Sequence, residues 1–168
     1  MHRNFNDMKL EDEIMQQRGF ASEYDKAIIN IFFTSSWLYN LNAARLKEYG
    51  VTPEQFNVLR ILRGSYPKPM MLNDISARML DKSSNATRLV EKLRQKGLVK
   101  REICPNNRRQ VDIMITEAGL GSLTAIDNGC QEWMKSVKSL SEAEVAELNR
   151  ILDSLRDQQP ITEVAQSR

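Results

Sequence analysis

The sequence predicts a mainly α-helical protein with one small β-hairpin. Apolar residues recur at helical spacing through most of the 168 residues, several of these runs begin with helix-capping residues, and two short strand-like runs flank a turn. The chain is 41% hydrophobic and 27% charged, so it is expected to fold as a globular protein.

The first long helix is expected over residues 20–47. Its apolar positions follow a helical stripe that no proline or glycine interrupts, and Gly50 is positioned to end it. Such a helix is too long for a small domain to bury by itself. We therefore expect it to take part in dimerisation.

A second helix is expected to begin in the segment VTPEQF. Thr52 suits the N-cap, Pro53 the first helical position, and Gln55 the reciprocal bond of a capping box. The helix is expected to run to about Arg63, where Gly64 would terminate it. Its predicted staple and buried positions are Val51, Phe56, Leu59 and Leu62.

Two short helices follow, over residues 72–80 and 83–96, with a tight break between them. Gly97 is expected to stop the second. The positions expected to face the core are Leu72, Ile75, Met79 and Leu80 in the first helix, and Ala86, Leu89, Val90 and Leu93 in the second.

A hairpin completes this unit. Strands are expected over residues 99–103 and 110–115, with the turn at Asn106–Asn107. In the second strand Val111, Ile113 and Ile115 share one face. Two short helices followed by a hairpin predict a winged helix-turn-helix, in which residues 83–96 form the recognition helix.

Two further helices are expected after the hairpin. Thr116 would cap one that runs to about Lys138, and Ser141 with Glu144 predicts a capping box before another. Their apolar seams consist of Leu120, Leu123, Ile126, Cys130, Trp133 and Val137, then Val145, Leu148, Leu152 and Leu155.

The long helices carry more apolar length than a winged domain of about 65 residues can cover. A two-fold homodimer would bury them and place two recognition helices about 34–36 Å apart. The expected segments are a flexible 1–19, a dimerisation helix in 20–50, the winged domain in 51–116, dimerisation helices in 117–157 and a flexible tail in 158–168.

Charge is distributed unevenly along the chain. Residues 82–110 contain nine basic and two acidic side chains, a net charge of +7, whereas the whole chain carries +2, which leaves −5 for the remainder. A positive band on an otherwise acidic molecule suggests nucleic acid as the partner. The alternative interpretation is an ordinary solvated basic helix face.

The exposed side of the recognition helix suits the major groove of double-stranded DNA. Short hydrogen-bonding side chains allow a close approach, asparagine can pair with adenine, and arginine can bind guanine or phosphate. The alternative is that the serines and the asparagine only start the helix. The candidate DNA-binding residues are Ser83, Ser84, Asn85, Thr87, Arg88 and Lys92.

The hairpin tip supplies a second candidate contact. A hairpin beside a recognition helix lies over the minor groove, which is electronegative over A·T runs and attracts arginine. Asn107, Arg108 and Arg109 are therefore candidate DNA-binding residues. Alternatively, the two arginines pair with Glu102 or Asp112 inside the hairpin.

The stretch from VTPEQFNVLRIL through NATRLVEKLRQKGLV to NRRQVDIMITEAG resembles the MarR family of winged-helix transcriptional regulators. The resemblance covers roughly residues 20–157. It implies a homodimer with interlocked N- and C-terminal helices. It also implies a repressor on a palindromic operator, often released by small phenolic or otherwise aromatic ligands.

One position departs from that family. Its wing motif is Asp-x-Arg, and here Asn107 stands at the aspartate position before Arg109, so the ion pair that would brace the arginine cannot form. The reactive cysteine that a peroxide-sensing branch carries in the first helix is absent. Cys104 is expected in the wing, where its redox activity is open, and Cys130 on a helix seam.

Other classes of function fit less well. The only histidine is His2, and the sequence contains no phosphate-binding glycine loop and no Cys-x-x-Cys, so no catalytic site, metal or cofactor is expected. The N-terminus resembles no signal peptide, no run is long enough to span a membrane, and two widely spaced cysteines suit the cytosol.

Two alternatives concern binding. A winged helix can serve as a protein-interaction module without sequence-specific DNA binding, although its recognition helix would then be apolar or acidic on the exposed side. A small aromatic effector is a further candidate partner, and Trp37 and Tyr39 on the first long helix are the candidate effector-binding residues. Core packing is the commoner role for such aromatic residues.

Overall fold

The computed structural model describes residues 9–104, 107–129, 134 and 140–157, with the backbone alone for 104 and 107–110. The chain divides into two compact units, Met1–Ile126 and Asp127–Arg168.

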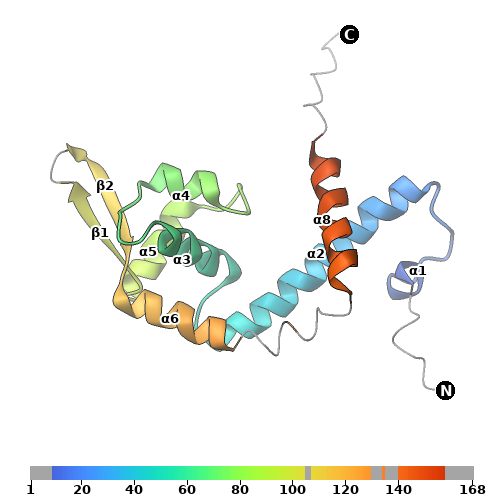
Figure 1. The fold of residues 1–168 in the computed structure, drawn as a ribbon, viewed down its shortest axis with the longest axis horizontal. Helices are drawn as coiled ribbons and strands as arrows, with labels where there is room; N and C mark the ends of the chain where they lie inside the picture. Colours follow the sequence, from blue (N-terminus) through green and yellow to red (C-terminus); the bar gives the residue numbers. More distant parts are fainter. Residues whose placement is uncertain (1–8, 105–106, 130–133, 135–139, 158–168) are drawn as a thin grey trace, which may run out of the picture. The chain divides into compact units, whose positions relative to one another are not determined.

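The elements, in chain order, are α1 Leu10–Glu13, α2 Glu23–Lys47, α3 Pro53–Ser65, α4 Leu72–Arg78, α5 Ala86–Gln95, β1 Val99–Cys104, β2 Asn107–Ile115, α6 Glu117–Asn128 and α8 Glu142–Arg156 (Figure 1). The predicted fold class, mainly α with one antiparallel hairpin, is confirmed.

Glycines end two helices as expected. Gly50 after α2 and Gly97 after α5 adopt φ values of 68° and 72°, which only glycine reaches without steric cost. The residue after each glycine donates its amide to a carbonyl five positions earlier, as Leu98 does to Leu93 at 3.0 Å. This closure satisfies carbonyl groups that the helix end would otherwise leave without partners.

Side-chain caps begin several of the helices, although α1 and α4 have none. The Thr52 hydroxyl accepts the Gln55 amide at 3.3 Å, and the Gln55 side chain accepts the Thr52 amide at 3.4 Å, which confirms the predicted capping box. The box of Ser141 and Glu144 is also present. In α2 the cap is Ser22, so this helix begins three residues later than expected.

The end of α3 differs from the prediction. Gly64 lies inside the helix and does not terminate it, because the last helical residue is Ser65. The chain leaves the helix at Tyr66, whose φ of −55° and ψ of 137° are extended. Tyr66 precedes Pro67, and a proline disfavours helical geometry in the residue before it. The proline therefore ends the helix.

The end of α4 also differs. This helix stops at Arg78, and the expected inward position of Leu80 is wrong, because Leu80 is 87% exposed. Met79 is extended, with ψ of 142°, and its side chain is 2% exposed. Extended backbone sends successive side chains in opposite directions, so Met79 enters the core and Leu80 points away.

The hairpin is antiparallel, with Val99 opposite Ile115 and Cys104 opposite Asn107. Both strands extend further toward the tip than predicted, so Asn107 belongs to β2 rather than to the turn, while Asn106 lies outside the described residues. Met70 adds an unpredicted bridge: its amide and carbonyl both bond to Ile113, each at 2.9 Å.

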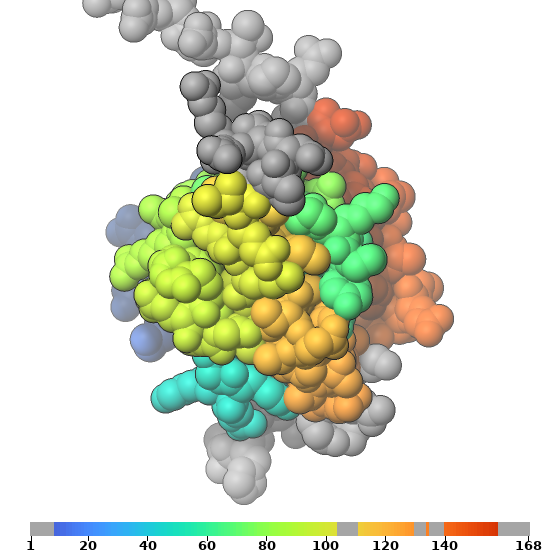
Figure 2. Space-filling view, turned by 90° about the vertical axis from the view of Figure 1, so that its left-hand side faces the viewer, coloured from blue at the N-terminus to red at the C-terminus, as the bar shows by residue number. Residues whose placement is uncertain are grey.

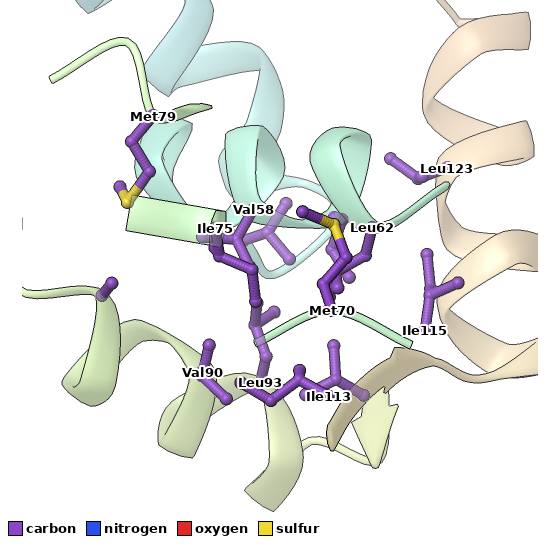
Figure 3. Close-up of a cluster of buried hydrophobic side chains, with 14 of the residues drawn as sticks. Val58, Leu62, Met70, Ile75, Met79, Val90, Leu93, Ile113, Ile115 and Leu123 are labelled. Carbon is purple, nitrogen blue, oxygen red and sulfur yellow. The ribbon is translucent and has the colours of Figure 1, made fainter. Parts of the chain in front are cut away.

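The core of the first unit lies between α3, α4, α5, the hairpin and α6 (Figure 3). Val58 and Leu62 enter it from α3, Ile75 from α4, and Leu93 from α5, each at most 1% exposed. The predicted inward positions of α5 are confirmed at Ala86, Val90 and Leu93, with Leu89 partly buried. This packing holds α5 in place with its opposite side turned outward.

The start of α6 is packed against the end of α5. The Thr116 hydroxyl accepts the Gly119 amide at 3.1 Å, which confirms the predicted cap, and donates to the Gly97 carbonyl at 2.7 Å. A Cβ on Gly119 would lie 2.3 Å from the Leu98 carbonyl oxygen, so only glycine fits there. The described part of α6 ends at Asn128, and the predicted seam residues Cys130, Trp133 and Val137 lie outside the described residues.

The segment predicted to be flexible, residues 1–19, contains the short helix α1, which the apolar pattern did not indicate. Leu10 is buried, and the Glu11 carboxylate lies 2.7 Å from the Lys26 ammonium. No helix within the described ranges is both long and apolar enough to cross a membrane.

Candidate nucleic-acid interface

Helix α5 exposes a polar face beside the hairpin. Its buried side packs into the core, and its opposite side presents Thr87, Arg88 and Lys92, all exposed. Helix α5 contacts β1, and the space-filling view shows their surfaces adjoining on one face (Figure 2). A helix and a hairpin on one face are the two parts with which a winged domain meets neighbouring grooves of a duplex.

The residues just before α5 are held by Asp81. Its carboxylate accepts the Ser83 amide at 2.9 Å and the Ser83 and Ser84 hydroxyls at 2.7 and 2.8 Å. These bonds, led by that of the Ser83 hydroxyl, hold the pKa of Asp81 below its ordinary value. The hydroxyl groups of two candidate DNA-binding residues, Ser83 and Ser84, are thus already hydrogen-bonded to another residue of the protein.

The start of α5 corrects the sequence prediction. The helix begins at Ala86 rather than at Ser83, and Asn85 is its N-cap, accepting the Arg88 amide at 3.0 Å. Serine and asparagine side chains compete for backbone groups and so favour caps over helix interiors. For Ser83, Ser84 and Asn85 the geometry matches the helix-starting interpretation.

Several cations of the basic band have partners within the protein. Arg94 binds Glu91 through two nitrogens, at 2.8 and 3.0 Å, and this contact lowers the pKa of the Glu91 carboxyl. Lys100 lies 3.0 Å from Glu102, one of the carboxylates considered for the wing arginines. Lys82 donates to the Ala77 carbonyl oxygen.

Lys96 has a structural role that the sequence pattern did not indicate. Its ammonium donates to the Gly50 carbonyl oxygen at 2.6 Å and to the Gln55 side-chain oxygen at 2.9 Å. Gln55 is only 2% exposed and belongs to the capping box of α3. Lys96 therefore joins the end of α5 to the start of α3.

Arg88 and Lys92 differ from these cations. They stand one helical turn apart, both are exposed, and neither side chain has a hydrogen bond or ion pair with any described residue. They line a groove of about 290 Å³ beside α5, whose other wall is the start of α3 with Thr52 and Glu54. The structure thus leaves these two cations available to an anionic partner.

The wing residues can be placed only by their backbone. Asn107, Arg108 and Arg109 lie in β2, toward the tip of the hairpin, and their side chains are outside the described residues. The side chains of Cys104 and Cys130 are also outside them. The predicted contacts of these residues stay predictions.

The two candidate effector-binding residues do not line the same cavity. Tyr39 lines a cavity of about 340 Å³ between α2, the start of α3 and the turn before α5, and its hydroxyl donates to the Glu54 carboxylate at 2.7 Å. Trp37, on the same helix, is 48% exposed and is not among the residues lining this cavity.

Comparisons with known proteins agree with this geometry. The MarR family model matches residues 51–111, from the start of α3 into β2. The HTH-type transcriptional repressor IacR of Pseudomonas putida is 31% identical over 117 residues, covering 68% of this chain and 69% of IacR. The chain belongs to the MarR family. The HTH-type transcriptional regulator MhqR of Bacillus subtilis is 35% identical over 101 residues, 60% of this chain and 68% of MhqR.

Solved MarR structures share the fold. The MarR transcription factor from Planctomyces limnophilus is 27% identical with a TM-score of 0.62, over 80% of this chain and 98% of that one. A mutant of E. coli MarR complexed with operator DNA gives a TM-score of 0.68 at 22% identity, over 88% of this chain and 99% of that one. The MarR proteins are DNA-binding transcription regulators rather than enzymes. Among the described residues no cluster of three or more metal-ligating side chains occurs.

Proposed function

We propose that this MarR protein is a homodimeric repressor that grips a palindromic operator with α5 in the major groove and the hairpin over the minor groove. The observation that carries the proposal is the pair Arg88 and Lys92. These side chains are exposed, one turn apart on the outward side of α5, and without a partner among the described residues. Lysine and arginine placed in this way bind phosphate and base edges.

The homodimer is supported by exposed apolar side chains on the helices outside the winged domain. On α2, Ile28 and Phe32 are 50% and 67% exposed, and on α8, Leu148 and Leu155 are 44% and 51% exposed. Apolar residues at this helical spacing need a covering surface. We assign residues 20–50 and 117–157 to dimerisation and 51–116 to DNA binding.

Repression and release by an effector are the finer parts of the proposal. The relative IacR is named as a repressor. The cavity lined by Tyr39 has the size of a small-molecule site, which typically measures about 300–1,000 Å³. A ligand there would lie next to the turn that leads into α5, because Asp81 also lines the cavity.

The rival proposal is a winged-helix protein-interaction module. An outward face carrying Thr87, Arg88 and Lys92 favours DNA, since a protein-binding face would be apolar or acidic. A gel shift with mixed genomic DNA separates the two. Binding through 6–10 phosphates should weaken by orders of magnitude between about 50 and 200 mM salt, whereas an interaction module should give no shifted band at either.

The decisive experiment is selection of bound duplexes from a random pool, together with analytical ultracentrifugation. We expect the selected sequences to form a palindrome and the protein to sediment as a dimer. A stable monomer, or a selected site without two-fold symmetry, would overturn the dimeric mode of binding.

A further inference from the structure

Arg101 of strand β1 is an exposed cation on the apolar face of the hairpin. It stands directly opposite Ile113 of β2, and directly opposite residues of an antiparallel pair project to the same face. Ile113 is 1% exposed, so this face of the hairpin covers the core. Arg101 itself is exposed. Its charged end therefore leaves the core at the edge of the hairpin.

The edge that Arg101 occupies is the junction between the hairpin and helix α5. Arg101 lines a cavity of about 20 Å³ together with Thr87 and Val90 of α5 and Val111 of β2. A space of this size holds about one water molecule, so it is no ligand site, but it shows that these side chains lie side by side. The space-filling view also shows the surfaces of α5 and β1 adjoining (Figure 2). The apolar stem of an arginine can cover such valines while its guanidinium stays in water.

The guanidinium of Arg101 is available to a partner. Its side chain has no hydrogen bond or ion pair with any residue that the structure describes. The pKa of the Glu91 carboxyl is lowered chiefly by its hydrogen bond from Arg94 and further by the charge of Arg101. Both oxygens of Glu91 already accept hydrogen bonds from Arg94, and one of them also accepts from Gln95. Glu91 is therefore engaged along its own helix.

Thr87 adds a second available donor at the same junction. It is the second residue of α5, it is exposed, and its hydroxyl has no hydrogen bond with any described residue. A guanidinium can bind a phosphate through two parallel hydrogen bonds, and a threonine hydroxyl can donate a third. Two donors from two different elements thus converge where α5 meets the hairpin.

A DNA duplex offers one kind of group at this position. In the proposed mode of binding, α5 occupies the major groove and the hairpin lies over the adjoining minor groove. A single sugar-phosphate backbone separates two adjoining grooves, so the junction between α5 and the hairpin faces that backbone. Contacts to phosphates fix the register and orientation of a protein on the duplex.

We propose that Arg101, together with Thr87, binds a phosphate of the DNA strand that separates the major groove from the minor groove. This inference rests on the proposed function, because it requires α5 and the hairpin to lie in adjoining grooves. The contact ties both elements to one strand and so fixes the position of the hairpin relative to the bases that α5 contacts. It also adds about one phosphate contact to the salt dependence of each half-site.

The salt dependence of binding tests the charge of Arg101. Arg101→Met keeps an apolar stem, so a role confined to covering the valines would leave DNA binding unchanged. We expect binding to weaken by roughly tenfold for each half-site, and the slope of log affinity against log salt to become shallower by about 0.9 for each half-site. A loss confined to the selected operator, with random duplexes bound as before, would assign Arg101 to a base edge and overturn the proposal.

The matched control is the neighbouring cation of the same strand. Lys100 projects to the opposite face of the hairpin, and its ammonium lies 3.0 Å from the Glu102 carboxylate. Lys100→Met should therefore leave the slope unchanged. An unchanged slope in Arg101→Met, or an equal reduction in both variants, would overturn the proposal.

Duplexes with one neutral methylphosphonate locate the contact. Each duplex carries the selected operator with a single phosphate neutralised, and the positions are scanned along both strands. We expect the unchanged chain and Arg101→Met to bind alike only where the neutral group lies between the bases contacted by α5 and the minor groove under the hairpin. The same roughly tenfold difference at every position would contradict the assignment, and so would loss of the difference at a distant position.

Two further substitutions keep the test independent of folding. Arg101→Lys retains the charge, so the slope should stay, while affinity falls because an ammonium cannot form the two parallel bonds. Thr87→Val removes only the hydroxyl and should weaken binding by roughly threefold to tenfold, whereas Thr87→Ser should restore it. A shallower slope in Arg101→Lys, or unaltered binding in Thr87→Val, would contradict the proposed contact.

The same measurements separate this inference from the proposed function. Urea unfolding followed by circular dichroism shows whether each variant is folded. If the unchanged chain binds DNA and folded Arg101→Met binds it equally well at every salt concentration, the inference alone is rejected. If the folded unchanged chain binds no duplex even in dilute buffer, the proposed function is rejected and this inference with it.

Discussion

The ammonium of Lys96 lies 2.9 Å from the side-chain oxygen of Gln55 and so joins the end of the recognition helix α5 to the start of α3. Gln55 is buried, and its side-chain oxygen also accepts a hydrogen bond from the backbone amide of Thr52. The side chain of Gln55 therefore links the two helices and the cap of α3. Lys96 thereby differs from Lys92, four residues earlier on α5, whose ammonium group has no partner among the described residues.

The first prediction uses this difference between two lysines of the same helix. Lys96→Met should weaken DNA binding without changing its salt dependence, because the lost contact is internal and positions α5. Lys92→Met should reduce the slope of log affinity against log salt by about 0.9, the value for one phosphate contact. Affinity measured at four salt concentrations checks both. A reduced slope in Lys96→Met would mean that Lys96 contacts DNA directly.

The second prediction concerns base recognition. Arg88→Ala should weaken binding to the selected operator by about 5- to 150-fold for each half-site, because a bidentate arginine–base contact is worth about 1–3 kcal/mol. Sedimentation should still give a dimer, since Arg88 lies on the exposed face of α5. Arg18→Ala, an exposed arginine before α2, is the matched control and should bind normally. Unchanged operator affinity in Arg88→Ala would show that another face meets the DNA.

The third prediction concerns the wing. Arg109→Ala should cost about 1–3 kcal/mol of binding free energy, mostly on operators with A·T-rich flanks, where the minor groove is narrow and most negative. Fluorescence anisotropy with A·T-flanked and G·C-flanked duplexes measures the difference. An equal loss on both duplexes would place Arg109 on the phosphates instead of in the groove.

The fourth prediction is a pH dependence. The pKa of Asp81 is lowered in the folded protein, chiefly by the Ser83 hydroxyl, so the unfolded chain binds a proton there more readily. The ionised Asp81 carboxylate therefore contributes to the free energy of unfolding. This contribution is complete above the ordinary aspartate pKa of about 4, and it is lost as the pH falls through the lower pKa of Asp81 in the folded protein. Between pH 5 and pH 3, Asp81→Asn should therefore lose less stability than the unchanged chain. Urea unfolding at each pH tests this, and parallel curves for the two proteins would contradict it.

The local features of this protein were determined by the sequence itself. The capping boxes at Thr52 and Ser141, the glycine ends at Gly50 and Gly97, and the outward face of α5 all depend on residues within a few positions of each other. Backbone sterics and short-range hydrogen bonds decide such features, so they can be predicted without knowing what lies opposite in space.

Only the tertiary structure decided which side chains remain available. Lys92 and Lys96 carry the same charge on one helix, yet only Lys96 reaches the carbonyl of Gly50, a residue 46 positions away in the chain. Likewise Leu80 fits the apolar pattern of α4 but is excluded from the core by the extended turn at Met79. The free energy of such contacts depends on groups that only folding brings together. The distances between these groups cannot be read from their spacing in the sequence.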